Sequence, residues 1–160
     1  MYSKGTTLKI DFVTFYHYGI ADGMGGVVHN SKKRLMVTHE SEADFAEGKE
    51  ILISDITSDN PSYALEKAKR YINMPYYLAK QNCEHFVRLC HGLDVESLQI
   101  KKYLLVGVLA GIAYKSKNPI IKSAGAAGSI TALCTSREKS PFRNAAIAVL
   151  ITAGVAYVIS

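Results

Sequence analysis

The sequence predicts an α+β domain, a small antiparallel sheet packed on a helix, followed by hydrophobic C-terminal helices. Three observations lead to this prediction. Short β-rich runs fill residues 1–60, two helical patterns follow up to residue 92, and residues 101–160 hold three long stretches with almost no charge. A chain of 160 residues suits one domain with an appendage. We therefore expect one α+β domain at residues 1–98 and a basic, hydrophobic helical tail at residues 99–160.

Short strands are expected in residues 1–60, where β-branched and aromatic residues alternate with turns and polar stretches. Residues 22–26 read Asp-Gly-Met-Gly-Gly, which is the turn chemistry of a hairpin. Antiparallel pairing across this turn would bring the imidazoles of His17 and His29 close together. The expected strands are Lys9–Ile20, Val27–His29, Arg34–Thr38 and Glu50–Asp55, with a helical turn at Glu42–Glu47.

A first helix is expected at Ser62–Tyr71. Asn60 or Ser58 can cap its N-terminus, and proline lies near its first turn. Its apolar residues recur at helical spacing, and Pro75 prevents any continuation.

A second helix is expected after Asn82, a good N-cap residue, and Gly92 can end it. This places Cys83 at the helix N-terminus. A thiol there feels the positive end of the helix dipole, and with a histidine beside it the thiol pKa can fall from ~8.5 into the range ~3.5 to 7.5. Cys83 is therefore a candidate nucleophile, although a small buried helix residue is the common alternative for a single cysteine.

Cysteine and two histidines form a workable thiol triad. One histidine takes the proton from sulfur and later protonates the leaving group, while the other orients the first through its remaining ring nitrogen. His17 and His29 could equally be ordinary half-buried strand residues, so the spacing alone leaves this open.

Two motifs stand out in the chain. Residues 82–86 read Asn-Cys-Glu-His-Phe, residues 17–20 read His-Tyr-Gly-Ile, and Val27-Val28-His29 places a second histidine twelve positions after His17. They resemble the cysteine box and the two histidine segments of the lecithin:retinol acyltransferase-like family, the permuted branch of the NlpC-type papain-like thiol hydrolases. Residues 41–53 and 64–78 resemble its connecting strand and its helix-plus-tyrosine segment. The resemblance covers roughly residues 7–92, and it departs in the turn, where Asp22 comes earlier and the glycines are denser.

The resemblance implies a circularly permuted papain-like (NlpC-like) fold and a thiol-dependent acyltransferase or phospholipase. Cys83 would attack a phospholipid acyl ester, with His17 as general base and later acid, and His29 orienting His17. A lysophospholipid would leave, and water, an amine or an alcohol would accept the acyl group. The oxyanion would be held by the backbone N–H of Cys83 and a donor such as Tyr18 or Tyr16, with Asn82 in support. Neither a cofactor nor a metal is expected.

Two other functions are compatible with these residues. The same triad could cleave an amide, as a cysteine amidase or peptidase of the same superfamily, but a basic apolar tail suits lipid better than a soluble polymer. The fold could also serve as a noncatalytic interaction module on a membrane, and an intact triad argues against that.

Charge divides the chain. Residues 1–100 carry 11 Lys and Arg against 13 Asp and Glu, a net of −2, whereas residues 101–160 carry 8 against 1, a net of +7. The tail's weakly charged runs are Tyr103–Tyr114, Pro119–Cys134 and Asn144–Ile159, and basic residues border them. A 16-residue helix spans ~24 Å, short of a ~30 Å hydrocarbon core, so the runs could cross a membrane, lie at its surface or pack on the domain. We expect residues 101–160 to associate with a membrane; no nucleic-acid partner is expected.

The cysteine count and the other histidines give three further predictions. The three cysteines are an odd number and the N-terminal residues show no secretory signal, so a cytosol-facing catalytic region is expected, with a cytoplasmic location as the alternative. His85 lies about 200° around the helix from Cys83 and should face away from the sulfur. His39 and His91 are expected to be exposed.

Overall fold

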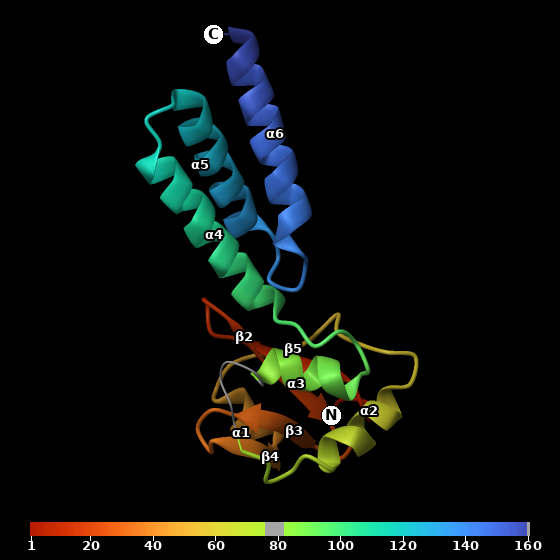
Figure 1. The fold of residues 1–160 in the computed structure, drawn as a ribbon. Coiled ribbons are helices and arrows are strands. Elements are labelled where there is room, and N and C mark those ends of the chain that lie inside the picture. Colours follow the sequence, from red (N-terminus) through yellow and green to blue (C-terminus); the bar gives the residue numbers. More distant parts are fainter. Residues whose placement is uncertain (76–81, 160) are drawn as a thin grey trace. The chain divides into compact units, whose positions relative to one another are not determined.

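The computed structural model describes residues 1–75 and 82–159. It forms two compact units, unit 1 (Met1–Ser97) and unit 2 (Leu98–Ser160). Within the described residues, unit 1 contains a five-stranded antiparallel sheet and three helices, and unit 2 contains three further helices (Figure 1). The α+β class predicted from the sequence is confirmed at this level.

The sheet of unit 1 has the strand order β4-β3-β2-β1-β5. Each neighbouring pair is antiparallel, and in the register Ile10 lies opposite His17, and Gly19 lies opposite His29. The hairpin predicted across residues 22–26 is thus present between β2 and β3. The strands are β1 (Thr7–Asp11), β2 (Tyr16–Ala21), β3 (Gly26–Ser31), β4 (Met36–Ser41) and β5 (Ile51–Ile53).

The single strand predicted over Lys9–Ile20 is wrong, because the chain reverses at residues 12–15 to form a β1–β2 hairpin. The Asp11 carboxylate accepts the backbone N–H of Val13 at 2.6 Å, and the N–H of Phe12 donates to the carbonyl of Phe15 at 2.9 Å. Val13 has a φ of 68°, which is rare for a β-branched residue. The turn residues Phe-Val-Thr-Phe have high strand propensity, so the sequence pattern predicted a continuous strand where the structure has a turn.

The fourth strand is displaced from its predicted position, Arg34–Thr38. Leu35 has a φ of 55° and lies in the turn, so β4 begins at Met36 and continues to Ser41. This shift brings Glu40 into the strand, which becomes important for the site.

Three helices cover the sheet. α1 (Glu42–Ala46) is capped by Ser41, and α2 (Pro61–Lys69) is capped by Asn60, whose side chain accepts the N–H of Tyr63 at 3.1 Å. α3 (Cys83–Cys90) is capped by Asn82, whose side chain accepts the N–H of His85 at 3.0 Å, and Gly92 follows with a φ of 71°. The caps that the sequence offered for α2 and α3 are the ones that the structure uses.

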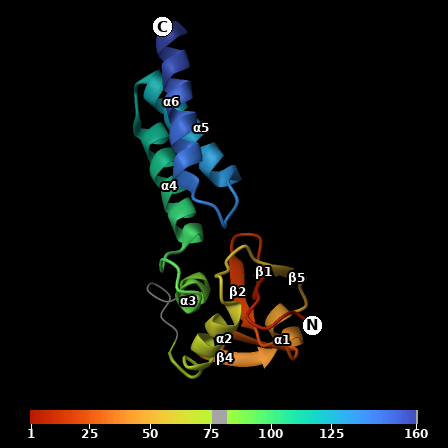
Figure 2. The same ribbon diagram turned by 90° about the vertical axis from the view of Figure 1, so that its right-hand side faces the viewer.

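Alternation along the strands gives the sheet two differently packed faces. On one face Tyr18, Ile20 and Val28 pack against α2 and α3. On the other face, the α1 face, the apolar strand residues surround Phe45. Figure 2 shows α3 and α1 on opposite sides of the strands.

Unit 2 is a three-helix arrangement of α4 (Leu98–Lys115), α5 (Pro119–Cys134) and α6 (Pro141–Ile159). Glycines of α5 make the close contacts: a Cβ on Gly125 would lie 3.0 Å from the carbonyl oxygen of Leu109, and one on Gly128 would lie 3.1 Å from Leu109 Cδ1. Gly107 and Gly111 of α4 have nothing within 4 Å of such a Cβ among the described residues. The GxxxG spacing in α4 therefore does not mediate packing within this unit.

One helix of unit 2 is long and apolar enough to cross a membrane. The window Pro141–Val158 of α6 has a mean hydropathy of 1.4, and 11% of it is buried. Large apolar side chains are also exposed along the unit, including Leu104, Leu150 and Val158 at 66%, 72% and 84%. This composition is typical of helices that contact lipid.

Candidate active site

Two histidines lie together on the α1 face of the sheet. The Nε2 of His17 on β2 lies 2.8 Å from the Nδ1 of His29 on β3. The register explains the contact, because His29 lies opposite Gly19 and His17 is two residues away on the same face. A Cβ on Gly19 would lie 3.0 Å from the ring of Phe45 and 3.1 Å from the Cβ of His29. The glycine therefore makes room first for the side chain of Val27 and then for the ring of Phe45. The Phe45 ring lies 5.5 Å from His17 and 5.2 Å from His29, centroid to centroid.

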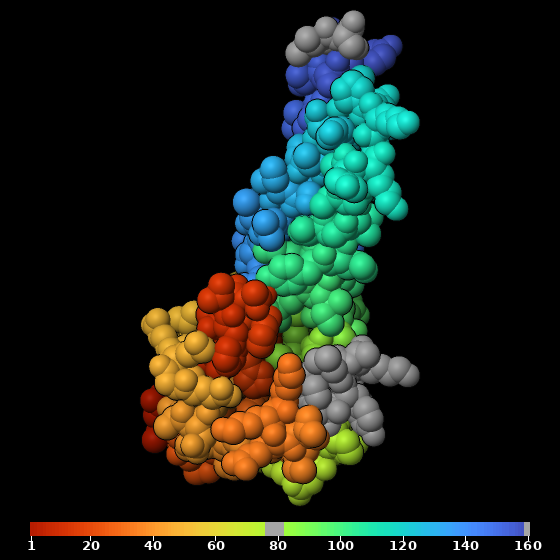
Figure 3. Space-filling view, turned by 90° about the vertical axis from the view of Figure 1, so that its left-hand side faces the viewer, coloured from red at the N-terminus to blue at the C-terminus, as the bar shows by residue number. Residues whose placement is uncertain are grey.

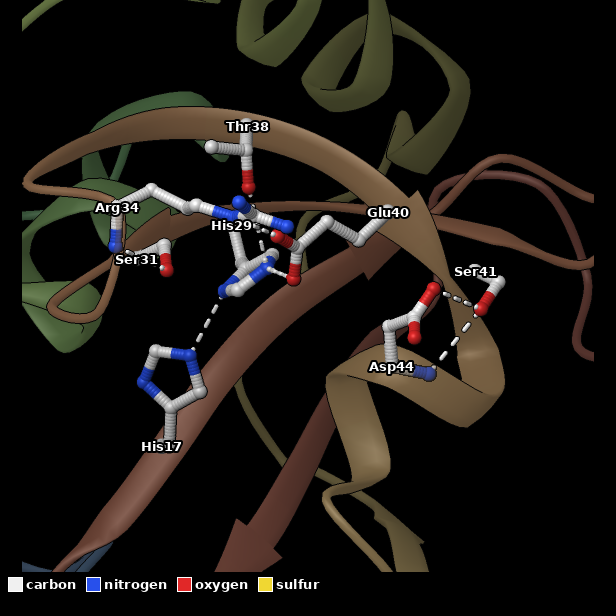
Figure 4. A network of polar contacts seen from close by, with 8 residues as sticks. All are labelled: His17, His29, Ser31, Arg34, Thr38, Glu40, Ser41 and Asp44. Carbon is white, nitrogen blue, oxygen red and sulfur yellow. Dashed lines mark hydrogen bonds and ion pairs between the residues drawn. The ribbon is translucent and has the colours of Figure 1, made fainter.

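A carboxylate extends the histidine pair into a hydrogen-bonded chain (Figure 4). The Nε2 of His29 lies 3.0 Å from Glu40 Oε2 on β4, and the hydroxyl of Thr38 lies 3.3 Å from the same nitrogen. Arg34 Nε donates to Glu40 Oε1 at 3.0 Å. Three adjacent strands and the β3–β4 turn thus contribute to one polar chain.

The hydrogen-bond partners of His17 and His29 determine which nitrogen of each ring carries a proton. An ionised carboxylate can only accept, so His29 must donate to Glu40 from Nε2, which leaves its Nδ1 without a proton. That Nδ1 then accepts from the Nε2–H of His17. The remaining nitrogen of His17, Nδ1, carries a lone pair and is the atom that can take up a proton.

The ionisation states agree with this assignment. Burial, helped by the neighbouring His29, lowers the pKa of His17 to about 3. Burial also lowers the pKa of His29, and the hydrogen bond to Glu40 only partly opposes it. Burial raises the pKa of Glu40, but the hydrogen bonds from Arg34 and His29 outweigh it and hold that pKa below its usual value. Near neutral pH both rings are therefore uncharged and the carboxylate is ionised.

Cys83 is the first residue of α3 and is 8% exposed. Its thiol donates to the backbone carbonyl of Tyr16 at 3.7 Å. β2 pairs with β3 at Gly19–Ala21, so Tyr16 lies before the segment of β2 that is paired with β3. The sulfur thus lies at the backbone of β2 beside the residues that flank His17.

The expectation that the helix start lowers the pKa of Cys83 is wrong for this structure. Burial raises the pKa of the thiol to about 11, although the backbone N–H of Tyr18 pulls in the opposite direction. At neutral pH the sulfur is therefore protonated. The apolar core around α3, rather than the helix dipole, decides its charge.

Cys83 and the two histidines belong to different packing clusters of unit 1. Cys83 belongs to the core cluster that contains Tyr18, whereas His17 and His29 contact Phe45 on the α1 face. Among the described residues, no hydrogen bond joins the sulfur of Cys83 to either histidine. A neutral thiol and a neutral imidazole therefore both lie at the segment of β2 around residues 16–18.

The proposed oxyanion residues have different surroundings. The side chain of Tyr18 is fully buried in the core, and Tyr16 is half-buried with Lys9 Nζ 4.9 Å from its ring centroid. The side-chain oxygen of Asn82 caps α3 by accepting from His85. The backbone N–H of Tyr18 favours the thiolate most, followed by those of Glu84 and Cys83, so β2 and the helix start both provide donors to the sulfur.

Sequence reasoning missed Glu40 and Arg34. The predicted strand ended at Thr38, although continued alternation would have placed Glu40 on the same face as Thr38 and beside His29. An acidic residue two positions after a strand threonine was the available signal.

Two other histidines lie outside the pair of His17 and His29. His91 was expected to be exposed, but it is 6% exposed and lies 2.7 Å from the hydroxyl of Thr7 and 3.0 Å from that of Ser58. The side chain of His39 is 45% exposed and lies 2.8 Å from Asp22. Each of these two histidines lies within hydrogen-bonding distance of a loop residue, Ser58 for His91 and Asp22 for His39. Neither contacts His17 or His29.

Part of the resemblance falls on residues 76–81, which lie outside the described residues. These include the tyrosines at 76 and 77 and Gln81. Among the described residues, no three His, Cys, Asp or Glu side chains converge in a way that could hold a metal ion.

No model of a known protein family matches the chain, and no curated protein matches it.

Proposed function

We propose that the chain is a thiol-dependent acyltransferase or phospholipase of the lecithin:retinol acyltransferase-like type, acting on phospholipid acyl esters through a Cys83 thioester. The hydrogen-bonded chain from His17 through His29 to Glu40 is the observation that carries this proposal. It leaves one lone pair, on His17 Nδ1, beside the strand segment that the sulfur of Cys83 contacts. A chain that fixes the tautomer of a neutral imidazole is what a general base requires.

In the acylation step the sulfur of Cys83 attacks the ester carbonyl carbon, and the thiol proton passes to His17 Nδ1. The tetrahedral intermediate collapses, the carbon–oxygen bond of the ester breaks, and the leaving lysophospholipid takes the proton from His17. In the second step water, an alcohol or an amine gives a proton to His17 Nδ1 and attacks the thioester. The proton then returns to the sulfur of Cys83.

The two pKa directions support proton transfer in concert with attack. A thiol with a pKa near 11 and an imidazole with a pKa near 3 do not exchange a proton at rest. Attack would instead be coupled to the transfer, with the developing oxyanion held by N–H groups at the start of α3. Small movements of β2 or α3 on substrate binding would bring the sulfur and His17 into contact.

The order of the chain and the properties of unit 2 fit the same proposal. The histidine strands precede the cysteine helix, as in a circularly permuted papain-like (NlpC-like) fold. The window Pro141–Val158 of α6 could hold the protein at a bilayer, and basic residues before it would contact anionic headgroups. In this arrangement unit 1 faces the cytosol.

Two competing functions remain open to test. An amidase or peptidase could use the same residues, but the apolar surface of unit 2 favours a lipid substrate over a soluble polymer. A noncatalytic module is favoured by one specific observation, the raised pKa of Cys83.

Turnover of a short-chain, water-soluble ester tests the proposal without requiring vesicles. The full-length protein should hydrolyse it, and Cys83→Ala and His17→Asn should each lose at least about 1000-fold in kcat while retaining the circular dichroism of the parent. Hydrolysis of a short amide but not of the ester would favour the amidase, and no turnover of either would favour the module.

A further inference from the structure

A pocket of about 450 Å³ opens beside His17 on the α1 face. Its walls come from the β1–β2 turn, the β3–β4 turn and the residue that follows α1. In Figure 3 the red atoms of the early strands and the orange atoms of the segment after β3 lie on one face of unit 1. The pocket therefore gives access to the histidine that we propose as the base.

One wall of this pocket is apolar. The rings of Phe12 and Phe15 stack with centroids 5.1 Å apart and 16° between their planes, and Phe15 is 43% exposed. The neighbouring Val13 is 84% exposed and has a φ of 68°. A left-handed valine that projects into solvent beside an aromatic pair costs free energy, and such strain is retained mostly at functional segments.

The opposite wall is cationic. Lys32 and Lys33 lie in the β3–β4 turn, both are exposed, and the contacts of the described residues include no ion pair for either. The next residue, Arg34, is bound to Glu40, so the two lysines are the free charges of this turn. Glu47 is the acidic residue of the pocket, which leaves an excess of positive charge.

We propose that this pocket binds an anionic glycerophospholipid from the bilayer, with the acyl chain on Phe12 and Phe15 and the phosphate on Lys32 and Lys33. A zwitterionic headgroup carries a positive charge that the two lysines would repel, so the positively charged lining favours a headgroup with net negative charge. The ester carbonyl then lies between the two walls, at His17. This inference rests on the proposed function and names the substrate class of that site.

Rates on vesicles test the lysines. Full-length Lys32→Gln/Lys33→Gln is compared with Lys69→Gln/Arg70→Gln, which removes the same charge from the C-terminal end of α2 on the other face of the sheet. The first variant should lose about 5-fold per lysine, about 25-fold in all, on anionic vesicles, and a smaller factor on zwitterionic vesicles, whose phosphate the lysines would also contact. Equal losses by both variants would overturn the proposal, because they would reflect general surface charge.

A binding measurement separates this inference from the proposed chemistry. The chain contains no tryptophan, so Phe15→Trp introduces a single fluorescent reporter at the pocket, and Tyr63→Trp on α2 introduces one outside it. Brominated anionic phospholipid in vesicles should quench the first reporter at least fivefold more than the second, and Lys32→Gln/Lys33→Gln should reduce that quenching. Such quenching without any ester turnover would leave the lipid site standing and remove the proposed catalysis. Equal quenching of both reporters would overturn the site.

Discussion

The Nε2 of His17 lies 2.8 Å from the Nδ1 of His29, and this contact fixes which nitrogen of each ring is protonated. Because His29 also donates to Glu40, the carboxylate determines which nitrogen of His29 is protonated, and His29 in turn determines which nitrogen of His17 is protonated. The lone pair on His17 Nδ1 is thus a consequence of a residue on β4, two strands away.

Replacing each histidine should separate their roles. His17→Asn removes the base and should be nearly inactive, with kcat reduced at least about 1000-fold. His29→Gln keeps one acceptor and one donor on a single side chain, so it can still bridge His17 and Glu40 and should lose only about tenfold. Steady-state kinetics on a soluble ester measure both variants. The reverse order of severity would mean that the two roles are exchanged.

Glu40→Gln should invert the tautomers of the histidine pair. Arg34 donates to Oε1, so the new amide oxygen should stay with Arg34 and the amide nitrogen should face His29 Nε2. His29 would then carry its proton on Nδ1, and His17 would present N–H where a lone pair is needed. We expect kcat to fall about 100-fold or more with little change in KM.

Two further variants control this prediction. Asp44→Asn changes a carboxylate that accepts a hydrogen bond from Ser41 and takes no part in the hydrogen-bonded chain from His17 to Glu40. This variant should leave kcat unchanged. Arg34→Ala in the Glu40→Gln background frees the amide to rotate, and it should restore part of the activity. Full activity of Glu40→Gln would show that the carboxylate does not set the tautomers.

Alkylation of Cys83 should depend steeply on pH. Burial raises the thiol pKa to about 11, so the thiolate is a minor species at pH 7 and its fraction rises about tenfold per pH unit until the pH approaches 11. Chloroacetamide labelling followed by mass spectrometry of the Cys83 peptide measures the rate between pH 6 and 10, with circular dichroism to show that the fold persists. A rate that levels off below pH 8 would instead indicate a preformed thiolate–imidazolium pair.

Local sequence signals predicted the elements that hold the candidate residues. Asn82 and Gly92 mark the two ends of α3, and the glycine-rich turn at residues 22–26 joins β2 to β3. These features are short-range, since a cap or a hairpin turn depends on a few neighbouring residues. The proximity of His17 and His29 then follows from strand register.

Features that depend on packing could not be predicted from such short-range sequence signals. The pKa of Cys83 is set by the core around α3 and not by its cap, and His91 is buried because Thr7 and Ser58 come from distant segments. Glu40 was missed because Leu35 adopts a left-handed conformation and displaces β4 along the chain. Each of these depends on contacts between residues far apart in sequence or on an unusual backbone conformation.

Truncation after Ser97 should separate chemistry from membrane contact. Unit 1 contains the histidine chain and Cys83, so the truncated protein should be folded, soluble and active on a short-chain ester. It should lose most of its rate on vesicles and fail to float with them. The full-length protein should float even in high salt, because apolar burial provides most of the affinity, and less well on neutral lipid, because each basic residue adds about 1 kcal/mol near an anionic surface. An insoluble, unfolded truncated protein would show that unit 2 is part of the folded core.

Trapping of the acyl-enzyme tests the central claim most directly. Full-length protein is incubated with vesicles of phospholipid radiolabelled in the acyl chain, and the denatured protein is examined for label that hydroxylamine releases. We predict a hydroxylamine-sensitive adduct in the parent, in Cys90→Ala and in Cys134→Ala, and none in Cys83→Ala, because Cys83 is the cysteine at the β2 segment beside His17. Equal labelling of all three cysteine variants, or no label in the parent while the ester is consumed, would contradict a Cys83 thioester.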